Sequence, residues 1–243
     1  MTRRTVTLIS ALLAAFVLAG CATRPMEGPQ DVNDPLEGTN RALFRVTLAV
    51  DKAVLRPTAI AYRDVVPEPA RNGIRNFLNN LNSPVILAND VLQGNMDRAG
   101  VTFLRAGVNS TLGIGGLIDV AAKWGYQRHS EDFGQTLAVY GVGEGAYLFI
   151  PLIGPSNPRD LVGWGVDFLF DPLTYVQWGD QWVLPYARVG LDITDLRARN
   201  IETLDELESS SLDYYASVRS LYRQSRANEI RNGATAVEDL PDF

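Results

Sequence analysis

Residues 70–81 read ARNGIRNFLNNL, and their apolar side chains fall on one face of a helix. Ile74, Phe77, Leu78 and Leu81 stand at positions i, i+3, i+4 and i+7, the spacing that aligns side chains along an α-helix. The opposite face is made of asparagine and arginine. This stretch therefore predicts an amphipathic helix with one apolar face and one polar face.

The flanking sequence continues the same pattern in both directions. Asp34-Pro35 supplies an N-cap and a proline at the first helical position, so a helix is expected to start there. The next stretch is expected to be broken at Arg56-Pro57. Further helices are predicted over residues 83–94, 96–109, 181–208 and 211–232. Residues 161–176 are also mostly apolar, and the helix there is expected to be capped by Asn157-Pro158 and to end at Asp171-Pro172.

Alternating strand patterns are scarce, apart from a short extended hairpin expected around residues 141–149. We therefore predict an all-α protein with a single helical domain over residues 34–228, followed by an acidic C-terminal tail over residues 229–243.

The N-terminus has the layout of an export signal. Arg3 and Arg4 precede an apolar run over residues 6–19, and Leu18-Ala19-Gly20-Cys21 follows the lipobox pattern of bacterial lipoproteins. We predict a signal peptide over residues 1–20, lipidation of Cys21 and a flexible tether over residues 21–33. An ordinary signal peptide with a chance cysteine, or an anchor helix that is not cleaved, are the alternatives.

The predicted lipid anchor indicates a location. Two or more acyl chains hold a protein stably in a membrane, whereas one chain binds marginally. Ala22 follows the cysteine, where an aspartate usually retains lipoproteins in the inner membrane. This favours the outer membrane of a Gram-negative bacterium.

Charge and composition exclude several classes of partner and site. The formal net charge of -6 becomes -8 once the two arginines of the signal are removed, and no basic stripe suggests nucleic acid. Cys21 is the single cysteine, so no intramolecular disulfide forms. One histidine, His129, stands in a polar stretch and is expected to be a solvated loop residue. We predict no catalytic residue, no metal and no cofactor, hence not an enzyme.

A glycine-rich loop comes next along the chain. Gly141, Gly143 and Gly145 alternate in a segment that matches a dinucleotide fingerprint, but the aromatic, proline-stopped sequence after it cannot supply the required helix. The glycines predict either a hairpin turn or a mobile loop.

Aromatic residues are concentrated in the middle of the chain. Six are candidates for a position at the membrane interface: Tyr147, Phe149, Trp164, Phe168, Trp178 and Trp182. Aromatic clusters also form ordinary protein cores, so the segment 146–182 can be either lipid-facing or internal.

The ordered motifs of residues 34–225 resemble the MlaA (VacJ) family of outer-membrane lipoproteins. The matching stretches are Asp34-Pro35-Leu36-Glu37-Gly38-Thr39-Asn40-Arg41, Leu55-Arg56-Pro57, Tyr62-Arg63-Asp64, 66–73, 92–94, 109–113, 116–121, 132–137, 140–143 and 151–155. Thr39 departs from the family pattern, which has an aromatic residue at this position. The difference affects the local contacts expected for the first helix.

The resemblance implies a function. Proteins of this family form a helical ring in the inner leaflet of the outer membrane, with an amphipathic channel. They extract mislocalised phospholipid from the outer leaflet, pass it to a periplasmic lipid carrier and associate with trimeric porins, which maintains lipid asymmetry. In that setting Gly141, Gly143 and Gly145 form a candidate gate loop. A structural envelope lipoprotein without transport activity and a lipid-anchored hydrolase are the other function classes considered.

Overall fold

The computed structural model describes residues 33–175 and 183–232. Cys21, the tether up to residue 32, Trp178, Trp182 and the end of the acidic tail lie outside the described residues. The predictions made for these residues therefore stay predictions.

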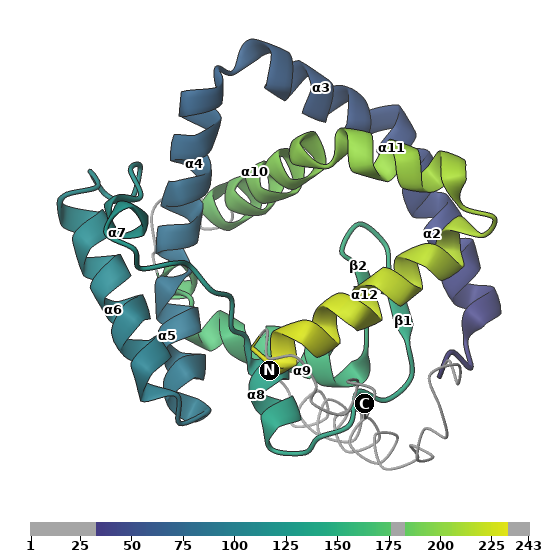
Figure 1. Ribbon diagram of the computed structural model, residues 1–243. Coiled ribbons are helices and arrows are strands. Elements are labelled where there is room, and N and C mark those ends of the chain that lie inside the picture. The colour runs from purple at the N-terminus through teal and green to yellow at the C-terminus, as the bar shows by residue number, and fades with distance from the viewer. Residues whose placement is uncertain (1–32, 176–182, 233–243) are drawn as a thin grey trace, which may run out of the picture.

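The helices follow one another around a ring, which Figure 1 shows face-on. A short antiparallel hairpin lies inside it, where β1 packs against α2 and β2 against α12. The elements are α2 (Glu37–Val50), the π-helical η1 (Asp51–Leu55), α3 (Arg56–Val65), α4 (Glu68–Leu81), α5 (Ser83–Leu92), α6 (Met96–Thr111), α7 (Val120–Lys123), α8 (Phe133–Val139), β1 (Leu148–Ile150), β2 (Gly154–Ser156), α9 (Pro158–Phe170), the 3-10 helix η2 (Pro172–Tyr175), α10 (Val183–Arg199), α11 (Ile201–Ser210) and α12 (Tyr214–Ile230). The predicted all-α class with one short hairpin is confirmed.

Local end signals placed several helices correctly. The Asn157 side chain caps α9 by accepting a hydrogen bond from the Asp160 N–H at 2.9 Å, and the helix ends before Asp171-Pro172 as expected. The predicted break at Arg56-Pro57 is wrong. The π-helical turn η1 leads directly into α3, and Pro57 stands near its N-terminus, where a helix does not need an N–H from it.

Three other predictions need correction. The helix expected over residues 181–208 is interrupted at Asn200, which separates α10 from α11. The hairpin lies later than expected and pairs Leu148 with Ser156 and Ile150 with Gly154. The expected N-cap Asp34 precedes α2 without capping it, because its carboxylate is bound elsewhere.

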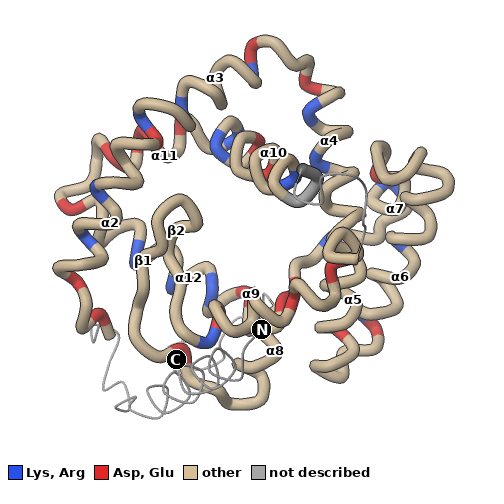
Figure 2. The backbone as a smooth tube through the Cα atoms, turned by 180° about the vertical axis from the view of Figure 1, so that it is seen from behind, with Lys and Arg blue, Asp and Glu red and all other residues tan. Residues whose placement is uncertain are grey.

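Arginine–carboxylate pairs join the helices at the junctions of the ring. Basic and acidic residues accompany each other along α2, α3 and α11 (Figure 2). The pairs have N–O distances between 2.5 and 2.9 Å and are Arg41–Asp213 and Arg219–Asp34 at α12, Arg197–Asp51 and Arg75–Asp195 at α10, and Arg56–Asp205 and Arg63–Glu202 at α11. Segments far apart in the sequence are thereby held together.

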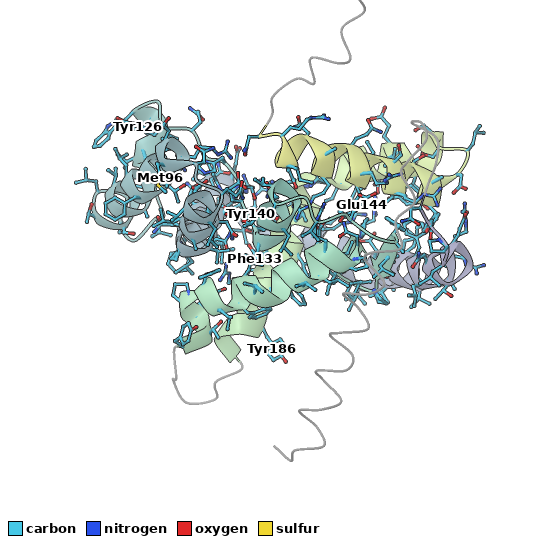
Figure 3. The ribbon with its side chains drawn as sticks, turned by 90° about the horizontal axis from the view of Figure 1, so that it is seen from below. Met96, Tyr126, Phe133, Tyr140, Glu144 and Tyr186 are labelled. Atoms are coloured by element: carbon cyan, nitrogen blue, oxygen red, sulfur yellow. The ribbon has the colours of Figure 1, made fainter. Side chains whose placement is uncertain are left out.

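Seen edge-on, the helices form a flat layer from one face of which α9 and α10 extend, with Tyr186 pointing away from it (Figure 3). Among the described residues, no helix is both long enough and apolar enough to cross a membrane.

Helices α8 and α9 pack closely against each other. Gly163 on α9 lies so close to α8 that an added Cβ would stand 2.3 Å from the Gly134 backbone nitrogen. Gly165, on the same helix, has no atom within 4 Å of the corresponding position.

These two glycines give a matched test of helix packing. Gly163→Ala should lower the free energy of unfolding by about 1–3 kcal/mol or more, because backbone must move to admit the methyl group. Gly165→Ala should raise it by up to about 1 kcal/mol, because alanine favours the helix. Thermal unfolding of both variants measures the difference. Equal stability of the two variants would contradict the close packing of α8 on α9.

Candidate functional site

The interior of the ring body is polar. The six largest fully buried side chains among the described residues are Gln135, Glu131, Asn89, Asn157, Thr136 and Asp90. The apolar cores are small by comparison. One contains Ala59, Ala198 and Ile201, and the other contains the aromatic side chains of the hairpin region. Burial of polar groups costs free energy unless each finds a partner, so this interior depends on hydrogen bonding.

The surface, in contrast, carries many large apolar side chains. On α9 and α10 the exposed members are Val162, Trp164, Phe168, Leu169, Tyr186, Val189, Leu191 and Leu196, and on α5 and α6 they are Val91, Leu92, Met96 and Phe103. Large exposed apolar side chains that gather on a few helices are typical of contact with a membrane or another protein. They accompany an interior that contains many polar groups.

Arg226 on α12 centres the densest cluster of charge. Its Nη1 and Nη2 donate to both oxygens of Asp132 at 2.6 and 2.7 Å, and its Nε donates to Asp160 at 2.9 Å. Tyr222 and Asn157 each donate to the same Asp160 oxygen at 2.7 Å. Burial alone would raise the pKa of both carboxyl groups, but Arg226 outweighs it and holds both pKa values below their usual range.

A cleft of about 280 Å³ opens beside this cluster. Its polar wall comes from Arg226 and its carboxylate partners. Its apolar wall is formed by Ile153, Pro155, Leu161 and Trp164. Trp164 is 53% exposed and stacks edge-to-face with Phe168 at 5.2 Å between ring centroids. The cleft therefore offers one charged and one apolar side to the same ligand, which suits an amphiphile.

Asp167 is the exception among these carboxyl groups. It accepts hydrogen bonds from Asn89 and from the Phe133 N–H, but it forms no ion pair with a basic side chain of the described residues. Burial raises the pKa of Asp167 to about 6.

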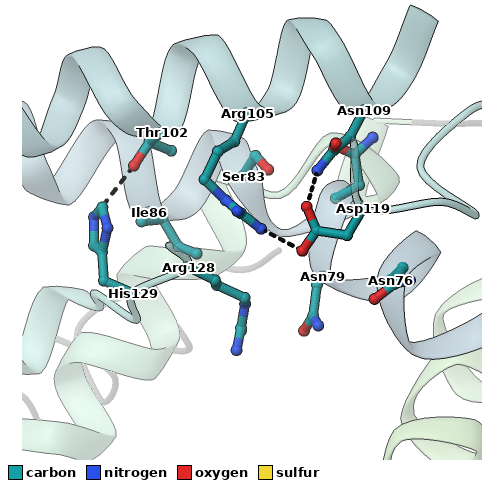
Figure 4. A pocket seen from close by; sticks show the side chains of 11 residues that line it. Asn76, Asn79, Ser83, Ile86, Thr102, Arg105, Asn109, Asp119, Arg128 and His129 are labelled. Carbon is teal, nitrogen blue, oxygen red and sulfur yellow. Dashed lines mark hydrogen bonds and ion pairs between the residues drawn. The ribbon is translucent and has the colours of Figure 1, made fainter. Parts of the chain in front are cut away.

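A second polar site lies between α4, α5, α6 and the connection from α7 to α8 (Figure 4). Arg105 donates to Asp119 at 2.9 Å and to the Tyr126 carbonyl, and Asn109 donates to the other Asp119 oxygen at 2.9 Å. These bonds fix the loop before α7 onto α6. The recess they enclose is about 20 Å³, the size of a water molecule.

His129 is not the solvated loop residue expected from its polar neighbours. Its side chain is 14% exposed, and Nε2 lies 2.9 Å from Asp90 and 3.2 Å from the Thr102 hydroxyl. The same ring nitrogen faces both groups, so the imidazole does not stand between a nucleophile and a carboxylate as a catalytic triad requires. The arrangement holds the α7–α8 connection in place.

The three glycines of the loop before β1 differ in their surroundings. Gly141, with φ 84°, is exposed and has open space around it, and Gly143 is exposed. Gly145, with φ 75°, is buried, and an added Cβ would stand 3.2 Å from the Pro158 ring. Its carbonyl also accepts a hydrogen bond from Asn33 at 2.8 Å. The loop is exposed at its start, where the Gly141 and Val142 N–H groups donate to the last turn of α8 at 2.9 Å, and it is buried at its end.

The aromatic candidates also divide. Tyr147 and Phe149 were expected at a membrane interface, but they are 4% and 5% exposed and pack with Tyr215 in a core cluster. The hairpin turns both side chains toward α2 and α12, which removes them from the surface. Trp164 and Phe168 lie on the surface of α9, where a membrane contact stays a prediction.

Sequence reasoning did not identify Arg226 and its partners as a site. Arg226 lies in a helix with many charges, and its two carboxylates are far from it in the sequence. One signal was present: Asp167 interrupts an otherwise apolar helix, which is unusual unless the carboxyl group has a role. Among the described residues, no group of three or more histidine, cysteine or acidic side chains is placed to hold a metal ion.

Comparison with known proteins gives the family. The family model described as MlaA lipoprotein matches residues 32–229. The chain belongs to the MlaA lipoprotein family. Two similar proteins are both called intermembrane phospholipid transport system lipoprotein MlaA. The protein from Haemophilus influenzae is 33% identical, with 98% of this chain and 97% of the relative covered. The protein from Escherichia coli is 39% identical, with 93% and 89% covered.

A solved structure supports the same assignment. It belongs to work on the structural basis for maintenance of bacterial outer membrane lipid asymmetry, and it matches with a TM-score of 0.74 and 37% sequence identity. The match covers 81% of this chain and 98% of the solved one. The helical ring is therefore an architecture that this MlaA-family chain shares with a solved structure.

The charge cluster of this MlaA-family chain predicts a large stability effect. Arg226→Ala should lower the free energy of unfolding by about 3–5 kcal/mol, because two buried carboxylates lose their counter-charge. Arg231→Ala, which removes an exposed arginine of the same region, should change it by less than about 0.5 kcal/mol. Chemical denaturation measures both. Similar small losses would show that Arg226 does not hold α8, α9 and α12 together.

Asp167 predicts a pH dependence of stability. Its pKa of about 6 in the fold exceeds the usual aspartate pKa of 3.8, so the folded state binds the proton more tightly. This contribution to stability is complete below pH 4 and is lost as the pH rises through 6. As the pH rises from 4 to 6, the unfolding free energy of Asp167→Asn should therefore increase by about 1 kcal/mol relative to that of the parent, allowing for solvent screening.

The measurement is the unfolding free energy of both proteins across that pH range. Asp64→Asn, which removes an exposed carboxylate, serves as the control. Parallel pH profiles for Asp167→Asn and the parent would rule out a raised pKa at Asp167.

Proposed function

We propose that this chain is an outer-membrane lipoprotein that removes mislocalised phospholipid from the outer leaflet and passes it to a periplasmic lipid carrier. The observation that carries the proposal is the combination of a buried polar network with large apolar side chains exposed on α9 and α10. The cleft beside Arg226, with one charged and one apolar wall, could hold an amphiphilic lipid and lower the cost of keeping its charged head group next to hydrocarbon. The names of the relatives from Haemophilus influenzae and Escherichia coli support the same role.

The proposed location is the periplasmic-facing leaflet of the outer membrane. Acyl chains on Cys21 would retain the protein there, and the exposed apolar residues of α9 and α10 would lie among lipid tails. A trimeric porin as lateral partner and the periplasmic carrier as acceptor are further parts of the proposal, and both rest on the resemblance to the family.

Within this function, the loop with Gly141, Gly143 and Gly145 is the proposed gate. Its first half is exposed and has open space around Gly141, which leaves room for movement. Its second half is held by Pro158 and Asn33, so movement would pivot about Gly145.

A bacterial strain that lacks this protein tests the function and the gate together. The parent chain should return outer-leaflet phospholipid to the normal low level. A chain carrying Gly141→Val and Gly143→Val should fail at equal protein level, because valine restricts the backbone at both positions. Gly165→Ala, on exposed helix surface, is the control and should restore the parent phenotype.

The outcomes separate the alternatives. A deletion strain with unchanged outer-leaflet phospholipid would favour a structural envelope lipoprotein without transport activity. Full clearance by the double valine variant would remove the gate and leave transport in place. Unchanged clearance after His129→Ala would rule out the lipid-anchored hydrolase, because His129 is the single histidine of the chain.

A further inference from the structure

Arg128 has an unusual environment for an exposed arginine. It lies on the connection between α7 and α8, which crosses the α4–α5 junction on the inner side of the ring (Figure 1). Within residues 33–175 and 183–232, no acidic side chain forms an ion pair with it. Solvent reaches the guanidinium, yet protein surrounds it closely enough that burial lowers its pKa.

Other cations stand close to this arginine. After burial, Arg105 and Arg199 are the next causes of its lowered pKa, and the carboxylates Asp119 and Asp192 oppose them only in part. An arginine without its own counter-ion beside two more arginines is unfavourable unless an anion joins them.

The neighbouring cations are already engaged. Arg105 is bound to Asp119 at 2.9 Å. Arg199 shares Asp195 with Arg75, and both N–O distances are 2.9 Å. Two arginines thus depend on one carboxylate next to Arg128. The local charge is positive in a chain whose formal net charge is -6.

Amide donors accompany the free guanidinium. Asn76 and Asn79 on α4 line the same recess, and Asn79 and Arg128 project their polar ends to the same side of it (Figure 4). Asn76 donates to the Leu117 carbonyl at 3.2 Å, whereas the Asn79 amide has no hydrogen-bond partner in the described part of the chain. The recess of about 20 Å³ is too small for a phosphate, so an anion would lie at its mouth.

We propose that Arg128 and Asn79 bind the phosphate of a phospholipid head group on the inner side of the ring. A guanidinium presents two parallel N–H groups that fit two phosphate oxygens, and the asparagine amide adds a third donor. A phosphodiester carries one negative charge, which suits a site with an excess of positive charge. The choice of a lipid as the source of the phosphate rests on the proposed function.

Binding in mixed micelles tests the site. The purified full chain is titrated with brominated phosphatidylglycerol, and tryptophan quenching reports binding. Brominated diacylglycerol with the same chains lacks the phosphate. Arg128→Gln should raise the apparent Kd for phosphatidylglycerol by about tenfold to a hundredfold and leave diacylglycerol unchanged. The apparent Kd of Arg128→Lys should lie between those of the parent and Arg128→Gln, because lysine keeps the charge but loses the two parallel N–H donors of the guanidinium. Arg231→Gln, with the same change of charge at a remote exposed position, should bind as the parent does.

A stability measurement excludes a purely structural role. Arg128→Gln should unfold at the same temperature as the parent or higher, because it removes repulsion from Arg105 and Arg199. A lower unfolding temperature would identify Arg128 as a structural residue and overturn the site.

Three further outcomes are decisive. Equal binding of phosphatidylglycerol by Arg128→Gln and the parent would overturn the inference. Displacement of the lipid by millimolar inorganic phosphate would assign the site to free phosphate and overturn the lipid assignment, whereas resistance to displacement supports it. Clearance of outer-leaflet phospholipid in cells tests the proposed function separately. If the parent chain clears phospholipid normally but Arg128→Gln binds phosphatidylglycerol as the parent does, only the proposed role of Arg128 is refuted.

Discussion

Every charged group buried in this protein must find a partner, and the ring depends on how that requirement is met. Its hydrophobic clusters are small, and at the junctions between distant helices arginine–carboxylate pairs connect the elements. All but two of the 22 basic residues are arginines. A guanidinium can bind a carboxylate with two hydrogen bonds and stays charged when buried, whereas lysine offers a single point of contact and loses its proton more readily. The preference for arginine therefore follows from an interior built of ion pairs.

Because this interior contains many polar groups, many of the large apolar side chains lie on the surface. In a soluble protein of this size, apolar side chains are withdrawn from water and their burial drives folding. Here many of the large ones lie outside, as Trp164 and Phe168 do on α9. Their exposure to water would be unfavourable, whereas contact with lipid tails would remove this apolar surface from water and recover the hydrophobic free energy. The proposed position in a leaflet thus belongs to the same energetic argument as the polar interior, since each is unfavourable without the other.

The sequence predicted features that depend on neighbouring residues and missed those that depend on distant ones. Asn157 caps α9 through the N–H of Asp160, three residues on, so the pattern alone located the helix start. Asp34 presented an equally good cap pattern, but its carboxylate instead accepts hydrogen bonds from Tyr215 and Arg219, 181 and 185 residues away. Tyr147 is buried for the same reason, because α12 covers it. The class of fold was therefore predictable, whereas the charge network that closes the ring was not, since no local pattern tells a buried arginine from a solvated one.

The same distinction separates the arginines that hold the fold from the one proposed to bind lipid. Arg226 is paired with two carboxylates whose pKa values it lowers, so its charge is neutralised within the protein. Arg128 has no such partner, and its nearest charged neighbours include two further cations. Folding alone gives no reason to keep a positive charge there, because a neutral side chain would relieve the repulsion. A ligand that brings its own negative charge supplies the reason, and a head group that moves along the inner side of the ring would bind there without competing for the ion pairs that close it.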